Sequence, residues 1–141
     1  MKSETRTGVY LLLKTDDEIL LMLRQNTGYG DGSWGTVSGH VEEGEGIIDA
    51  LLRETKEEIA VEICRDDLKL AHVMYYYDDY PSVCFFFVCK KYSGKICNAE
   101  PHKCGGVKFF KENELPSNLF KPLKTAFDNI RKGEFFSEMI F

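Results

Sequence analysis

The chain has 141 residues, of which 43% are hydrophobic and 29% are charged, proportions typical of a soluble globular protein with one hydrophobic core. Its formal net charge of −5 argues against a nucleic acid polymer as partner, because binding such a polymer needs a basic surface. The polar N-terminus is followed by an apolar run of only about five residues, too short for a secretory signal or a membrane-spanning helix. We therefore expect a single domain over residues 1–141, located in the cytoplasm and without a membrane partner.

The five cysteines are an odd number and show no Cys-x-x-Cys spacing. Such a set fits reduced thiols better than a disulfide framework or a zinc site. Cys97 and Cys104 flank His102, but a chance arrangement is favoured over a reactive Cys-His pair.

Two apolar runs open the chain, at residues 9–14 and 18–24, and a polar turn at residues 15–17 separates them. This pattern predicts a hairpin of two core strands. Arg24 ends the second strand next to a loop, where its guanidinium is a candidate phosphate contact. A solvated or ion-paired arginine is an equally good interpretation.

Residues 25–35 form a glycine-rich connection that also contains the only tryptophan, Trp34. Such a segment is typical of a mobile loop, and we expect a substrate lid here. Tyr29 and Trp34 are the candidates for stacking on a ligand ring, although a packed core position is favoured for Trp34.

Residues 46–59 are expected to form a helix with two different faces. At 100° per residue, Glu54, Glu57 and Glu58 fall within about 100° of one another, on a single acidic stripe, while a separate and mostly apolar stripe can pack on the core. Like charges four residues apart repel, so the acidic stripe needs a cation. Oxygen ligands without a nearby pair of His or Cys favour Mg²⁺, or Mn²⁺ in its place, over zinc.

The residues before and within this helix resemble the Nudix box, the signature of a hydrolase family. Its pattern is Gly, five residues, Glu, seven residues, then Arg-Glu-hydrophobic-any-Glu-Glu-any-Gly-hydrophobic. The matching positions are Gly39, Glu45, Arg53, Glu54, Glu57, Glu58 and Val61. Thr55 stands where the family has an aliphatic residue, and Ala60 stands where it has glycine. That glycine normally supplies a positive φ, which Ala60 would adopt reluctantly.

The resemblance implies roles for the matching residues. Arg53 would pair with Glu45 and act by orienting carboxylates rather than by chemistry of its own. A cation held by the acidic stripe would bridge phosphate oxygens and lower the pKa of a bound water. The expected catalytic residues are Glu54, Glu57, Arg53 and Glu45. The expected metal ligands are Gly39, Glu54, Glu57 and Glu58.

After the helix, a short strand at residues 61–64 and a longer one at residues 68–77 are predicted, with a turn between them. In the longer strand Tyr76 faces the opposite way from its two tyrosine neighbours, so tyrosines from only one side can line a pocket. The chain breaks around Pro81, and the continuous apolar run at residues 83–90 predicts a strand covered on both faces.

Residues 93–106 are rich in turn residues and are expected to form a loop, a region where the family often places an extra metal ligand or base. Glu100 is the candidate here, although a solvated loop glutamate is the favoured interpretation. A last strand is expected at residues 107–111, followed by an amphipathic helix at 119–132 with Asn118 as its N-cap.

Together these elements predict an α/β fold, by resemblance the Nudix α/β/α sandwich, with a mixed sheet, the box as loop and helix, and a C-terminal amphipathic helix. The implied activity is Mg²⁺-dependent hydrolysis of a nucleoside diphosphate linked to another moiety. A nucleoside triphosphate, oxidised ones included, is the first choice of substrate, with nucleoside monophosphate and pyrophosphate as products. ADP-ribose, nucleotide sugars and dinucleoside polyphosphates are the alternative substrates.

A nucleotide-sensing module without catalysis is the alternative from another class, and the intact carboxylate set argues against it. The candidate substrate contacts are Arg24, Tyr29, Trp34 and Glu100. The sequence leaves open whether the protein forms a homodimer.

Overall fold

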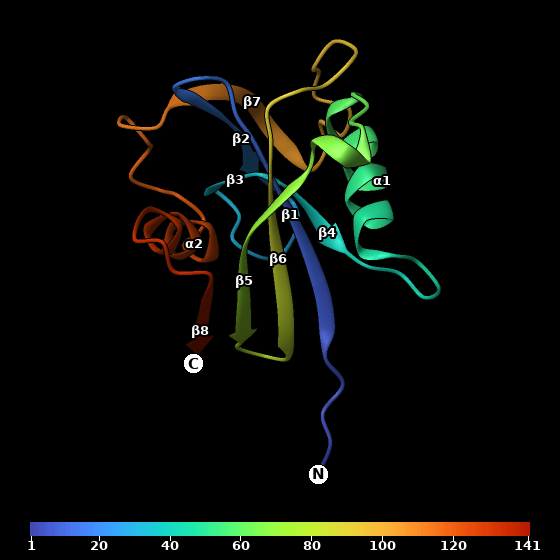
Figure 1. The fold of residues 1–141 in the computed structure, drawn as a ribbon, viewed down its shortest axis with the longest axis vertical. Helices are drawn as coiled ribbons and strands as arrows, with labels where there is room; N and C mark the ends of the chain where they lie inside the picture. Colours follow the sequence, from blue (N-terminus) through green and yellow to red (C-terminus); the bar gives the residue numbers. More distant parts are fainter.

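Two β-sheets form the centre of the structure, a computed structural model that describes residues 1–141 (Figure 1). The strands are β1 (Arg6–Leu13), β2 (Glu18–Arg24), β3 (Trp34–Gly35), β4 (Val37–His40), β5 (Lys69–Tyr77), β6 (Pro81–Cys89), β7 (Cys104–Lys111) and β8 (Phe136–Ile140). The helices are α1 (Ile47–Ile59) and α2 (Lys121–Arg131), with a 3₁₀ turn at Arg65–Asp67. Neither helix has the length and apolar character that crossing a membrane requires.

The larger sheet has the order β4-β1-β6-β5-β8, and the smaller sheet has the order β3-β2-β7. β1 pairs with β4 in antiparallel and with β6 in parallel orientation, so the larger sheet is mixed, as predicted. The two helices pack on opposite faces of this sheet. Alternate residues of its strands point to opposite faces, so each helix packs against its own set of buried side chains. The α/β class and the sandwich architecture are therefore confirmed.

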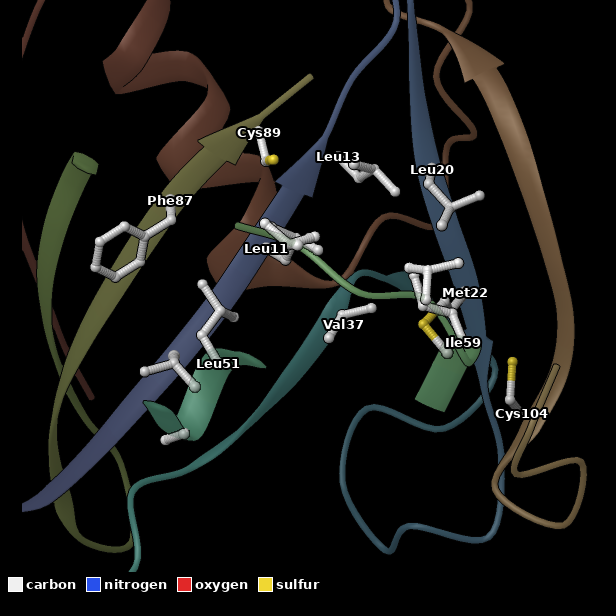
Figure 2. Packing of buried hydrophobic residues seen from close by; sticks show 14 residues of the cluster. Leu11, Leu13, Leu20, Met22, Val37, Leu51, Ile59, Phe87, Cys89 and Cys104 are labelled. Atoms are coloured by element: carbon white, nitrogen blue, oxygen red, sulfur yellow. The ribbon is translucent and has the colours of Figure 1, made fainter. Parts of the chain in front are cut away.

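The core on the α1 side gathers side chains from both sheets and the helix (Figure 2). Leu11 of β1 and Phe87 of β6 belong to this cluster, whereas Leu12 and Phe86 belong to the cluster on the α2 side. All four side chains are buried. The prediction of a strand covered on both faces at residues 83–90 is thus confirmed.

The prediction that residues 9–14 and 18–24 form a hairpin is wrong. One bridge joins Lys14 to Ile19, and beyond it the two strands enter different sheets. Both edges of β1 are already occupied by β4 and β6, so β2 has no free edge to pair with and joins β3 and β7 instead.

Other boundaries also differ from the predicted ones. Residues 61–64 make a single bridge, between Glu62 and Ser93, instead of a strand. β6 includes Pro81, whose missing N–H is tolerated at the first residue of a strand. β7 begins at Cys104, three residues earlier than expected. All five cysteines are free thiols, as their number and spacing indicated.

The C-terminal region holds two further differences. Asn118 is not the N-cap of α2, because its side-chain amide donates to the carbonyl of Gly32 and Phe120 takes the cap position. β8 was not anticipated, and it adds to the edge of the larger sheet in parallel with β5, from Val73 opposite Phe136 onward. A parallel partner distant in sequence leaves no local turn signal.

Ala60 ends α1 in the left-handed conformation, with φ 61° and ψ 28°, and its N–H donates to the carbonyl of Lys56 at 3.1 Å. The positive φ expected at this position of the box is therefore present even though the residue is alanine. A side chain with a Cβ is strained in this region, whereas glycine adopts it freely.

We expect Ala60→Gly to raise the free energy of unfolding by about 1 kcal/mol, measured by urea denaturation, because glycine removes that strain. Ala99→Gly is the matched control: Ala99 is also exposed but does not have a positive φ, so glycine there should bring no gain. Equal effects of the two substitutions would show that the left-handed conformation of Ala60 is not strained.

Candidate active site

Gly39 and Glu54 lie in direct contact where β4 passes beside α1. A Cβ added at Gly39 would overlap the Glu54 carboxyl group. Gly39 has no positive φ, so space and not backbone conformation requires glycine here. The contact leaves the backbone of Gly39 next to a carboxylate on the acidic stripe of the helix.

Arg53 and Glu45 form a two-pronged ion pair that closes the loop before α1 onto the helix. Arg53 Nε donates to Glu45 Oε2 at 2.8 Å, and Nη2 donates to Oε1 at 3.0 Å. These hydrogen bonds from Arg53 lower the pKa of Glu45 to about 2, and Glu45 in turn raises the pKa of Arg53. The pairing expected between the two residues is present.

The same guanidinium also contacts three further carboxylates. Arg53 Nη1 lies 2.8 Å from Glu54 Oε1 and 3.4 Å from Glu57 Oε2, and Nη2 lies 3.2 Å from Glu42 Oε1. One cationic side chain therefore faces four anionic ones, counting Glu45. The cluster keeps an excess of negative charge, which favours a further cation close by.

Glu58 is the least satisfied acid of the group. Its Oε2 atom is buried and has no hydrogen-bond partner. Burial, followed by the hydrogen bond and the charge of Glu54 and the charge of Glu100, raises the pKa of Glu58 well above its ordinary value. Without a cation, the Glu58 carboxyl group therefore holds its proton more tightly than an ordinary glutamate does.

The donors present suit a hard divalent cation. Glu54 and Glu58 supply carboxylate oxygens, Glu58 Oε2 is a buried acceptor without a partner, and the backbone of Gly39 lies next to Glu54. In this conformation no three His, Cys, Asp or Glu side chains converge as a ready-made metal cluster. Glu57 is held by Arg53 and its side chain is 49% exposed.

A cavity of about 600 Å³ opens beside these acids, a size in the range of small-molecule sites. Residues of both sheets line it, including Tyr10 of β1 and Met22 of β2. We call one set of its lining residues the acidic part, made of Glu54, Glu58 and Glu100. A second set, the aromatic part, is made of Tyr29, Tyr76 and Phe120.

In the aromatic part, a hydrogen bond joins the loop after β2 to strand β5. Tyr29 Oη donates to Tyr76 Oη at 2.6 Å, and Tyr76 Oη lies 3.4 Å from Asp78 Oδ2. The rings of Tyr29 and Phe120 meet edge to face at 5.4 Å between centroids. The Tyr29 hydroxyl therefore connects the two sheets across the cavity.

The loop that carries Tyr29 is held by its own hydrogen bonds. The Asp31 carboxylate accepts from the N–H groups of Thr27, at 3.1 Å, and Gly28, at 3.0 Å. Hydrogen bonds from Thr27 and Gly28 lower the pKa of Asp31. Arg24 Nε donates to the carbonyl of Tyr29 at 2.9 Å, and its guanidinium lies over the Phe120 ring. A loop predicted only from its glycines thus has a defined conformation.

The structure brings six of the predicted site residues to the cavity: Arg24, Tyr29, Gly39, Glu54, Glu58 and Glu100. Glu45, Arg53 and Glu57 lie next to it without lining it. Trp34 is elsewhere, packed edge to face against Phe110 at 4.8 Å, which agrees with the core position favoured for it.

Sequence reasoning missed other lining residues, including Tyr76, Asp78, Lys103 and Phe120. The alternation of side chains along β5 set Tyr76 apart from its neighbours but did not say which face holds the cavity. Lys103 stands out in its loop only as one of a few charged residues, and both Lys103 and Phe120 reach the cavity through the packing of distant segments.

Known proteins share the domain and the fold of this chain. The NUDIX domain matches residues 3–131 of the chain. A MutT NUDIX hydrolase from Burkholderia pseudomallei superposes with a TM-score of 0.82 at 25% identity, over 89% of this chain and 97% of that one. A MutT protein from Methanosarcina mazei Go1 superposes with a TM-score of 0.80 at 16% identity, over 94% and 97%. A UDP-X diphosphatase superposes with a TM-score of 0.69 at 18% identity, over 97% of this chain and 68% of that one.

The matched domain covers nearly the whole chain and therefore defines its class. The chain belongs to the NUDIX hydrolase family. Its class of reaction is therefore hydrolysis of the pyrophosphate linkage in small nucleoside diphosphate-linked substrates, for which the family generally uses a divalent cation such as Mg²⁺.

The raised pKa of Glu58 predicts how stability without metal depends on pH. Above its ordinary pKa of 4.5 the unfolded chain loses a proton that the folded chain keeps, so the free energy of unfolding in EDTA should fall as pH rises from about 4.5. Glu58→Gln removes the group that binds this proton. The free energy of unfolding should then fall less steeply with pH, and the melting temperature at pH 8 should rise. Glu62→Gln, at an exposed acid, should keep the wild-type slope. Identical slopes in all three proteins would contradict the prediction.

Proposed function

We propose that the protein hydrolyses a nucleoside triphosphate, oxidised forms included, to a nucleoside monophosphate and pyrophosphate with the help of Mg²⁺. The observation that carries this proposal is one cavity of about 600 Å³ that combines the acidic part, the aromatic part and two cationic side chains, Arg24 and Lys103. A nucleotide with its phosphates and a metal ion needs these three kinds of surface together.

The residues proposed to hold the metal are Glu54, Glu57 and Glu58, with the backbone of Gly39. When bound there, the ion would polarise the phosphorus and lower the pKa of a water. Arg53 positions two of these carboxylates, Glu54 and Glu57, through its hydrogen bonds, and Glu45 holds Arg53 in place. This arrangement supports Glu54 and Glu57 as the catalytic acids and Arg53 and Glu45 as positioning residues.

The aromatic part is proposed to receive the base. Tyr29 is 42% exposed, so its ring is accessible to a ligand although its hydroxyl is fixed by Tyr76. Stacking on an aromatic ring retains any base, and the carboxylate of Asp78 beside Tyr76 can accept hydrogen bonds from amino or imino groups. Arg24 is bound to the same loop through its Nε and forms no salt bridge, so its charge is proposed to attract a phosphate.

ADP-ribose, nucleotide sugars and dinucleoside polyphosphates contain the same scissile linkage and are the alternative substrates. One structural neighbour is a UDP-X diphosphatase, and we therefore retain these substrates as alternatives. A sensing module without catalysis is disfavoured, because Glu54, Glu57 and Glu58 would bring charge repulsion without a benefit to binding alone.

A panel of nucleotides incubated with Mg²⁺, with released phosphate and pyrophosphate measured separately, tests the proposal. A nucleoside triphosphate should give the highest kcat/KM and release pyrophosphate. Glu57→Gln and Glu58→Gln should each lower kcat by roughly 10²-fold, because each removes a carboxylate that acts in the transition state.

Glu62→Gln is the control, since Glu62 is an exposed acid paired with Lys56 away from the cavity. Near-normal kcat in both glutamine variants would overturn the assignment of the acids. A higher kcat/KM for a nucleotide sugar or for ADP-ribose would replace the proposed substrate with one of the alternatives.

A further inference from the structure

Positive charge is scarce in the cavity. Six carboxylate residues line it, and Arg24 and Lys103 are its only lysine or arginine residues. Neither cation forms a salt bridge, whereas Arg53 beside the cavity is fully engaged with carboxylates. The ammonium group of Lys103 also donates no hydrogen bond within the protein, so all its donors are available.

The backbone around Lys103 is fixed rather than loose. The N–H groups of Lys103 and Cys104 both donate to the carbonyl of Glu100, at 2.9 Å and 3.0 Å, which makes a tight turn. The side chains of Gln25 and Asn26 donate to the carbonyls of Pro101 and His102, each at 2.9 Å. These contacts tie the turn to the residues that directly follow Arg24.

The same turn lies beside the acids of α1. The N–H of Ala99 donates to the backbone carbonyl of Glu58 at 3.1 Å, and the charge of Glu100 acts on the Glu58 carboxyl group. Lys103 therefore projects from a turn held between the acidic part of the cavity and Arg24. Phosphates drawn to the acids through a metal ion would lie within the field of its charge.

We propose that Lys103 binds the phosphate groups beyond the scissile bond, so that it favours a substrate with free terminal phosphates over one whose diphosphate is capped by a sugar. This proposal rests on the proposed function. It identifies the charge of the leaving group as the feature of the substrate that Lys103 recognises. A lysine ammonium is a compact point charge suited to phosphate, and a free terminal diphosphate carries more negative charge than a capped one.

The test compares Lys103→Gln with two matched variants. Lys103→Arg keeps the charge, and Lys95→Gln removes the same charge from an exposed lysine that does not line the cavity and forms no salt bridge. Isothermal titration calorimetry with Mg²⁺ measures binding of an α,β-methylene nucleoside triphosphate, which resists hydrolysis, and of the corresponding monophosphate.

Lys103→Gln should weaken binding of the triphosphate analogue by roughly ten-fold, in line with the loss of one charge-assisted hydrogen bond, and leave monophosphate binding unchanged. Lys103→Arg should restore most of the affinity, and Lys95→Gln should match the wild type. With hydrolysis as a second readout, the ratio of kcat/KM for the triphosphate to that for a nucleoside diphosphate sugar should fall in Lys103→Gln.

Equal losses for the triphosphate and the monophosphate, no loss for either, or wild-type binding that does not prefer the triphosphate would overturn the proposal. The binding comparison does not depend on turnover. A wild-type protein that hydrolyses no nucleotide would refute the proposed function, while its binding data would still decide the role of Lys103.

Discussion

The site depends on one guanidinium. Arg53 holds Glu45 with two hydrogen bonds and also contacts Glu42, Glu54 and Glu57, so it joins the loop before α1 to the acidic stripe of the helix. Without Arg53 these carboxylates would repel one another, and the loop would lose the side-chain hydrogen bonds that hold Glu45 and the carbonyl of His40 to the helix. Its planar fork matters as much as its charge, because only a fork can hold one carboxylate with two bonds and still reach others.

Around this anchor, the sheets determine which side chains reach the cavity. β4 lies at the edge of the larger sheet, where Gly39 lets the Glu54 carboxyl group approach the backbone. The smaller sheet carries Arg24 and the loop of Tyr29, and the larger sheet carries Tyr76. The hydrogen bond between the two tyrosines spans the gap between the sheets. The acids are the residues proposed to determine the chemistry, whereas residues from distant segments shape the space that a substrate would occupy.

The sequence predicted well what is local in the chain. The limits of α1 and its acidic stripe follow from periodicity and spacing within the 23 residues of the box, Gly39 to Val61. The positive φ at position 60 was implied only by the resemblance to the family, and its presence at an alanine is a finding of the structure. Pairing between distant strands was not predictable in this way. The false hairpin arose because two apolar runs with a turn between them carry no information about the partners β4 and β6. Lys103 was missed for the same reason, since Gln25, Asn26 and the α1 terminus bring its turn to the cavity.

The most direct measurement of the central role of Arg53 is the kcat of Arg53→Lys with Mg²⁺ and the best substrate, taken together with its melting temperature. Lysine keeps the positive charge but cannot hold Glu45 with two hydrogen bonds while contacting Glu54. We expect kcat to fall by roughly 10²-fold in a protein that remains folded. A wild-type kcat in Arg53→Lys would contradict this expectation, because charge alone would then suffice to organise the acids.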